Sequence, residues 1–294
     1  MNAPKIHIIT PNAEKEIDLF NKFLNHPIFP QHRNMIFSAF PDLQNSLKNT
    51  PRDEEENIVR EFIFNFYKEN DEKIQKIALE ASVEANEKML PALKELAVLM
   101  DYEWKDGHPG YTAIPTILPF SPFEKDLFYF SILGELRGTK GKGVSFIGIH
   151  EISHFILFDT LASIYERNFE KELGTNLLYF LKEILAPVLM NQPTIAKILS
   201  VENYSGNQNF KEIYILNENN EKVQISRYFQ RFYEKARSEN KKFTDIVKEM
   251  ILLLRSIQNE IDLRQKMWNE NGPKIFQDDP LLQKYSEGIK ITPQ

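Results

Sequence analysis

The chain has 294 residues, of which 42% are hydrophobic and 27% charged, and its formal net charge is −6. These values fit a soluble globular protein with one large core or two modest ones. The negative charge and the lack of a basic stripe with interleaved aromatic residues argue against nucleic-acid binding. No cysteine is present, which excludes a disulfide framework. No run approaches about 18 uncharged apolar residues, and 1–18 has no signal-peptide core. We therefore expect a cytoplasmic protein without a membrane span.

Helices are predicted over most of the first hundred residues. Thr10 is a suitable N-cap and Pro11 a suitable first helical residue for the first of them. A second helix is expected over 51–70, where a proline and an acidic first turn suit the positive end of a helix dipole. A third is expected over 71–102, kinked or broken at Pro91.

This pattern predicts a helical N-terminal region over residues 1–103 and a second region over 104–294 with strands as well as helices. The two regions can also form one continuous domain. The N-terminal helices have three interpretations, namely a surface that binds a partner, a cap that restricts access to a cleft, and ordinary helical packing.

The composition changes after Gly110 toward residues that favour strands. Segment 111–118 is rich in Thr, Ile and Tyr, and segment 127–133 is aromatic and β-branched, so both are predicted as strands. Pro115 lies near the middle of the first strand and cannot donate a ladder hydrogen bond. We therefore expect that strand to lie at a sheet edge or to be bulged.

One segment carries chemical information, the HExxH motif His150-Glu151-Ile152-Ser153-His154. It lies in an apolar run without proline, 144–158, which is predicted to be helical. His150 and His154 then share one helix face, about 5–6 Å apart at Cβ, so both imidazoles can bind one zinc ion. Glu151 is placed to act on a zinc-bound water. Composition alone gives about 0.01 chance occurrences of the motif, so coincidence does not explain it.

Three polar residues in an apolar helix require partners, because burying them unpaired is costly. A metal supplies that partner. Two alternatives remain open at this point. The histidines can be core residues satisfied by hydrogen bonds, with Glu151 on the surface, or the site can have lost its metal.

The motif, with its uncharged and apolar flanks, resembles the active-site helix of the zincin metallopeptidases over about residues 144–160. The resemblance implies a zinc-dependent peptide hydrolase with Glu151 as general base. It also implies an α+β, predominantly helical fold in which 104–294 forms a zincin-like core, with a small sheet before the active-site helix. The edge strand of such a sheet pairs with extended substrate. A plain structural hairpin is the alternative for the two strands.

Catalytic zinc needs a third protein ligand and an open position for water. The metzincin branch of the family is excluded, because Leu157 and Thr160 stand three and six residues beyond His154. A third histidine could come only from upstream of the motif, from His7, His26, His32 or His108. A downstream carboxylate is the remaining choice, which is the gluzincin arrangement, and the candidates are Asp159, Glu166, Glu170, Glu172 and Glu183.

Glu183 is the predicted third ligand. It lies inside an apolar segment, 177–190, that is expected to be helical, and a carboxylate there requires a cation or a metal. Asp159 points about 140° away from His154 around the helix, and the other three glutamates lie in a charged connection. Two features depart from thermolysin-like enzymes, namely Pro187 in place of an acid four residues after the ligand and a longer spacing from His154.

Other polar residues are candidates for supporting roles. Asn176 and Tyr179 share the Glu183 face and could orient a zinc histidine or serve as a cap and packing residue. Zincins often add a Tyr or His that stabilises the oxyanion, and the sequence does not choose among His108, Tyr204, Tyr214 and Tyr228.

The rest of the chain is predicted to contain a hairpin, 213–216 with 223–225, then helices over 228–237 and 243–267 and an irregular tail from Trp268. The expected function is a cytoplasmic zinc metallopeptidase that acts on a peptide or protein. The alternatives are a zinc hydrolase of non-peptide amides or esters and a catalytically inactive zincin-fold binding or regulatory protein.

Overall fold

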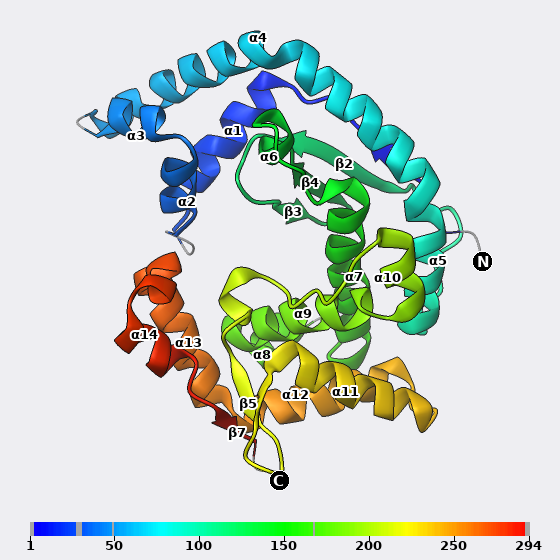
Figure 1. Cartoon of the computed structure of the whole chain (residues 1–294). Helices are drawn as coiled ribbons and strands as arrows, with labels where there is room; N and C mark the ends of the chain where they lie inside the picture. The colour runs from blue at the N-terminus through cyan, green and yellow to red at the C-terminus, as the bar shows by residue number, and fades with distance from the viewer. Residues whose placement is uncertain (1–2, 28–30, 49, 167, 292–294) are drawn as a thin grey trace. The chain divides into compact units, whose positions relative to one another are not determined.

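The computed structural model describes residues 3–27, 31–48, 50–166 and 168–291. Helices dominate and two small sheets accompany them, so the prediction of an α+β, predominantly helical fold is confirmed (Figure 1). The chain divides into two compact units that interleave along the sequence. We call them the N-terminal unit (3–90 and 106–148) and the C-terminal unit (91–105 and 149–294). Whether 1–103 folds separately from 104–294 stays a prediction.

The N-terminal unit combines a four-stranded sheet with helices. Helix α1 packs along α4, and the buried side chains of Phe20, Leu43 and Ile63 contribute to its core. Its elements are β1 (Ile6–Ile8), α1 (Ala13–Leu24), α2 (Gln31–Ala39), α3 (Pro41–Leu47), α4 (Arg52–Glu84), the π-helical turn η1 (Ala85–Met89), β2 (Tyr111–Thr116), β3 (Phe123–Glu124), β4 (Leu127–Ser131) and α6 (Leu133–Leu136).

Three predictions about the first helices are corrected. Helix α1 begins at Ala13 rather than Pro11, because the side chain of Asn12 accepts a hydrogen bond from the Glu14 amide at 2.8 Å and so caps it; asparagine is a better N-cap than threonine. Helix α4 continues through residue 70. Pro91 does not end the helix, because the wider π turn η1 precedes it and relieves the clash between a proline ring and the carbonyl four residues earlier.

Strand β2 is not an edge strand, because the sheet order is β1-β2-β4-β3. Strands β2 and β4 run parallel, so they do not form a hairpin. Pro115 is nevertheless accommodated without loss of a ladder bond. The backbone N–H of Thr112 points toward β4, whereas that of Tyr111 points toward β1. Pro115 lies on the β1 side of the strand, two residues beyond Ala113, which is the last residue paired with β1. No β1 acceptor therefore stands opposite Pro115.

The N-terminal unit buries the carboxyl group of Glu16, which is 4% exposed. Thr116 Oγ1 donates to its Oε1 at 2.6 Å, and Tyr67 Oη donates to its Oε2 at 2.9 Å. Burial raises the pKa of Glu16 to about 7, against the lowering effect of these hydrogen bonds. The acid therefore binds its proton more tightly in the folded protein than in the unfolded chain.

This difference predicts a pH dependence of stability. The folded pKa of Glu16 lies above the unfolded value of 4.5. Its contribution to the free energy of unfolding is therefore complete below about pH 4.5 and is lost as pH rises through about 7. The shift corresponds to about 3 kcal/mol. Urea unfolding at about pH 5 and pH 8 should show that Glu16→Gln gains stability relative to wild type as pH rises.

The matched control is Glu14→Gln on the same helix, where Glu14 pairs with Arg60 in solvent. Its effect should stay below about 1 kcal/mol at both pH values. If the two variants showed the same pH dependence, Glu16 would not be the group responsible.

The C-terminal unit is organised around α9 (Thr175–Met190), which contacts α8, α10, α11, α12 and α13 (Figure 1). Eleven of the sixteen α9 residues are buried, including Glu183. Helices α5 and α7 enter this unit at Pro91 and Ile149. The other elements are α5 (Leu90–Leu99), α7 (Gly143–Ile164), α8 (Phe169–Leu173), α10 (Pro193–Leu199), the 3-10 turns η2 (Gln208–Phe210) and η3 (Gly272–Gln277), β5 (Tyr214–Leu216), β6 (Lys222–Gln224), α11 (Ile225–Ser238), α12 (Phe243–Ser256), α13 (Gln258–Asn271), α14 (Asp279–Tyr285) and β7 (Ile289–Lys290).

The predicted hairpin is confirmed, since β5 and β6 pair antiparallel. Two expectations for the end of the chain are wrong. The helix predicted over 243–267 is interrupted at Ile257, whose φ of −119° and ψ of 23° leave the helical region. The described part of the tail contains the regular elements α14 and β7. Strand β7 pairs parallel with β5 through Ile289 and Ile215, a contact between distant residues that local pattern does not show.

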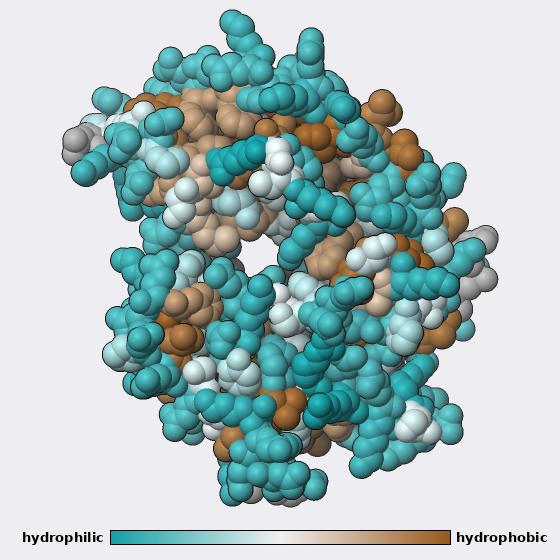
Figure 2. All heavy atoms as spheres, viewed as in Figure 1, coloured by the Kyte–Doolittle hydropathy of each residue, from teal (hydrophilic) through white to brown (hydrophobic). Residues whose placement is uncertain are grey.

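Helix α7 is, within the part of the chain that the structure describes, the one helix long and apolar enough to cross a membrane. The protein itself buries 83% of its most apolar window, which is typical of a core helix. Figure 2 shows a largely hydrophilic face with hydrophobic patches, some of them along α4, where Phe64, Leu79 and Val83 are exposed.

Candidate metal centre

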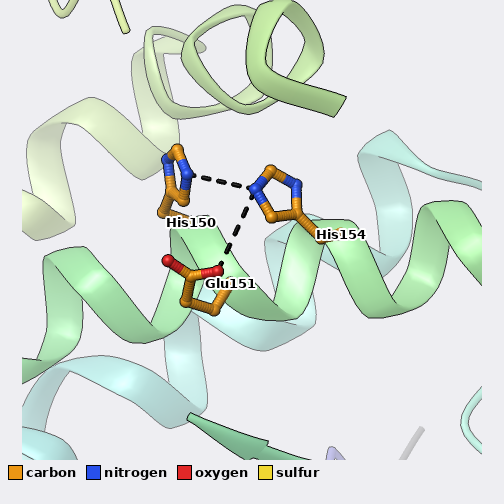
Figure 3. Close-up of side chains that lie close together, drawn as sticks. All are labelled: His150, Glu151 and His154. Atoms are coloured by element: carbon orange, nitrogen blue, oxygen red, sulfur yellow. Dashed lines mark hydrogen bonds and ion pairs between the residues drawn. The ribbon is translucent and has the colours of Figure 1, made fainter. Parts of the chain in front are cut away.

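The three polar residues of the motif lie together on α7 and are buried. His150 and Glu151 are each 6% exposed and His154 is 1% exposed. The Nε2 atoms of the two histidines lie 3.1 Å apart, and Glu151 Oε2 lies 4.0 Å from His154 Nε2 (Figure 3). The predicted helix is confirmed. Glu151 is buried, so the surface position that the core-histidine alternative gave it is wrong.

Helix α9 brings Glu183 to the two histidines. Its Oε2 lies 3.5 Å from His150 Nε2, and its Oε1 lies 3.7 Å from His154 Nε2. The carboxylate is 4% exposed, because its neighbours on α9 are packed among the surrounding helices. The structure therefore places Glu183 beside the motif, where a third ligand is required, while its role as a ligand stays a prediction.

The spacing of these atoms can be compared with the spacing of ligands around a metal ion. Donors held about 2.0–2.1 Å from a tetrahedral ion lie about 3.3 Å from one another. The separations among His150, His154 and Glu183 are 3.1, 3.5 and 3.7 Å, close to that value. His150, Glu151 and His154 are also close enough to hold an ion, with donors within 4.8 Å. Glu151 Oε2 lies 4.0 Å from His154 Nε2, slightly farther than the 3.7 Å of Glu183 Oε1.

The protonation states favoured by the surroundings suit metal binding. Burial, followed by the charges of Lys182 and His150, holds the pKa of His154 well below its usual range, although Glu183 opposes the shift. Burial alone would raise the pKa of Glu183, but Lys182 and the two histidines together hold it well below its usual value. A neutral imidazole and an ionised carboxylate are the ligand forms of these side chains.

Lys182 is a member of the site that the sequence did not indicate. Its Nζ donates to Glu183 Oε1, and it lies 5.4 Å from the centre of the Tyr179 ring. Neighbouring helical residues point about 100° apart, so adjacency on α9 gave no reason to place both side chains at one point. Glu183 therefore already has a protein cation beside it.

The segment after α10 supplies two further contacts. Tyr204 Oη lies 3.3 Å from His150 Nδ1, on the side of the ring away from His154. Asn207 Nδ2 donates to Glu183 Oε2 at 2.8 Å. Of the four candidates for the oxyanion role, Tyr204 is thus the one that lies at the motif, where its hydroxyl contacts the His150 ring. Asn207 was missed, because no local pattern marks it.

The other candidates have different surroundings. Tyr214 donates to Glu212 at 2.9 Å, Tyr228 packs against Phe229, and His108 belongs to the N-terminal unit. The two residues predicted to orient a zinc histidine have other partners, since Asn176 donates to Asp262 at 2.7 Å and Tyr179 accepts from Asn209 at 3.2 Å. Among the other candidates for the third ligand, Asp159 accepts from Tyr102 at 2.7 Å, and Glu166, Glu170 and Glu172 are exposed. His7, His26 and His32 lie in the N-terminal unit.

The site can hold a metal ion with two imidazoles and a carboxylate, and it places a second carboxylate next to them. Two imidazoles and a carboxylate are donors of the kind that zinc takes in proteins. No protein-family model, curated protein or solved structure matches this chain.

Proposed function

We propose that this protein is a zinc-dependent metallopeptidase in which His150, His154 and Glu183 bind the metal and Glu151 is the general base. The observation that carries the proposal is the convergence of the two Nε2 atoms and the Glu183 carboxylate within 3.1–3.7 Å of one another. The order of elements along the chain, with a small sheet before α7, supports a zincin-like core.

Each side chain of the site has a separate role in the proposed hydrolysis. Bound zinc supplies a Lewis acid that polarises a carbonyl and lowers the pKa of water toward about 7. Glu151 accepts the proton of the attacking water at its carboxylate and passes it to the leaving amine. His150 and His154 offer Nε2 lone pairs, and Glu183 offers a negative charge. Because all four are buried, these charges act in a medium where they are weakly screened.

The proposed substrate is a peptide or protein, and the proposed location is the cytoplasm. The chain contains no cysteine, so it needs no oxidising compartment for disulfides. The motif determines activation of water rather than the identity of the substrate. A substrate panel therefore has to include non-peptide amides and esters beside casein and short peptides.

The test is the metal content and activity of the wild-type protein. We expect about one zinc per chain and hydrolysis of casein or short peptides. A chelator should remove both, and added zinc should restore both. Turnover confined to non-peptide amides or esters would instead support the alternative hydrolase.

One observation favours a second candidate, a zincin-fold binding or regulatory protein without turnover. The ion pair between Lys182 and Glu183 gives the buried carboxylate a cation in place of a metal. In that case the wild-type protein would take up no zinc even when it is supplied, and the peptidase proposal would be wrong.

A further inference from the structure

Two residues of one short segment, 201–209, contact two of the proposed metal ligands. Tyr204 Oη lies at the Nδ1 atom of His150, at 3.3 Å, whereas the Nε2 atom of that ring faces His154. Asn207 Nδ2 donates to the Glu183 oxygen that is nearer His150, at 2.8 Å. The loop therefore contacts His150 at the ring nitrogen away from His154, and it contacts Glu183 at the oxygen beside His150. We call residues 201–209 the ligand-backing loop.

The ligand-backing loop is fixed to the helices on both sides of it. The side chain of Asn191, which follows α9, donates to the Tyr204 carbonyl at 2.6 Å and accepts from the Tyr204 amide at 2.9 Å. Ser226, on α11, donates to the Ser205 carbonyl at 3.0 Å. These bonds hold the backbone that carries Tyr204 in one place, so its hydroxyl meets His150 at a defined position.

The loop also passes directly over the backbone of α9 at Glu183. Pro187 has no N–H to donate to the Glu183 carbonyl four residues earlier. At Gly206, a Cβ atom would lie 3.4 Å from that carbonyl oxygen and 3.5 Å from Pro187 Cγ, and the φ of Gly206 is +89°. The backbone angle favours a glycine there, whereas a Cβ atom would meet its neighbours at ordinary van der Waals distances.

We propose that Tyr204 and Asn207 are positioning residues for His150 and Glu183, and that the ligand-backing loop thereby sets the metal affinity of the site. This inference rests on the proposed function. An Nδ1–H that donates to Tyr204 Oη leaves the Nε2 lone pair for the metal and fixes the plane of the ring. The bond from Asn207 holds the Glu183 carboxylate against rotation.

The experiment measures zinc affinity by competition with a chelator, for wild type, Tyr204→Phe and Asn207→Ala. Loss of an outer partner of a ligand typically weakens binding about 10–100-fold, which is the expected result for each variant. Two matched controls remove the same groups elsewhere in the C-terminal unit. Tyr102→Phe removes a hydroxyl bonded to Asp159, and Asn271→Ala removes an amide bonded to the Met267 carbonyl. Both controls should bind zinc as wild type does.

A second measurement separates positioning from general stability. The visible d–d spectrum of the cobalt-substituted protein reports the geometry of the ligands. It should change in Tyr204→Phe and Asn207→Ala but not in the controls. Urea unfolding of the zinc-free proteins identifies any variant that fails to fold. If one of the two variants does not fold, the zinc affinity and cobalt spectrum of the other test the positioning role.

The outcomes distinguish this inference from the proposed function. If wild type binds no zinc, both are wrong. If wild type binds zinc and the two variants match it in affinity and in cobalt spectrum, the loop does not position the ligands, while the proposed function stands. Weaker binding with an altered spectrum supports the inference.

Discussion

Replacing Glu151 with glutamine should abolish peptide hydrolysis while zinc stays bound. The amide of glutamine cannot accept the proton of the attacking water, and a general base contributes about 10²–10⁴-fold to the rate. Zinc should remain because the proposed third ligand is Glu183, whose oxygens lie 3.5 and 3.7 Å from the histidine Nε2 atoms, whereas Glu151 Oε2 lies 4.0 Å from His154 Nε2. Activity on casein and zinc per chain are measured on the same preparation.

Asp159→Asn is the matched control for this variant. It makes the same acid-to-amide change on α7, at an exposed residue that accepts from Tyr102. It should keep both zinc and activity. An active Glu151→Gln protein would refute the role assigned to Glu151, and loss of zinc from that protein would indicate that Glu151 is itself a ligand.

Replacing Glu183 with glutamine should remove most of the zinc. An ionised carboxylate that faces both histidines becomes a neutral amide, so the site loses the one negative charge among its three proposed ligands. The loss of affinity should exceed the roughly 10–100-fold typical of an outer partner, because a direct ligand is changed. Chelator competition measures the dissociation constant, with His150→Ala as a reference for a site that has lost a ligand.

The control for Glu183 is Glu172→Gln, which changes an exposed glutamate that the sequence also offered as a ligand. It should leave the zinc affinity unchanged. Unchanged zinc occupancy in Glu183→Gln would move the third-ligand assignment to another carboxylate, and Glu151 is the nearest one in the metal-binding group.

Local sequence was sufficient for features that depend on near neighbours. Residues four apart on a helix share a face, so the meeting of His150 and His154 at 3.1 Å follows once the apolar run forms α7. The hairpin β5–β6 was predicted for the same reason, since its strands are close in sequence. The burial of Glu183 was indicated by its apolar neighbours in α9.

Features made by distant pairings were mispredicted or missed. Strand β1 pairs with β2 more than a hundred residues later, and this pairing turns a predicted edge strand into an inner one. Strand β7 joins β5 in the same way. Nothing in the composition of a three-residue strand identifies its partner, because the pairing is selected by packing and by the satisfaction of backbone hydrogen bonds across the whole unit.

The motif by itself determined where a metal centre could form and which residue could act as its base, because one turn of helix fixes that geometry. Tertiary structure decided what surrounds it. The packing of α9 brings Glu183 and Lys182 to the histidines, and the ligand-backing loop brings Tyr204 and Asn207. These side chains come from elements tens of residues apart, and only the burial of apolar faces against one another fixes such elements in place.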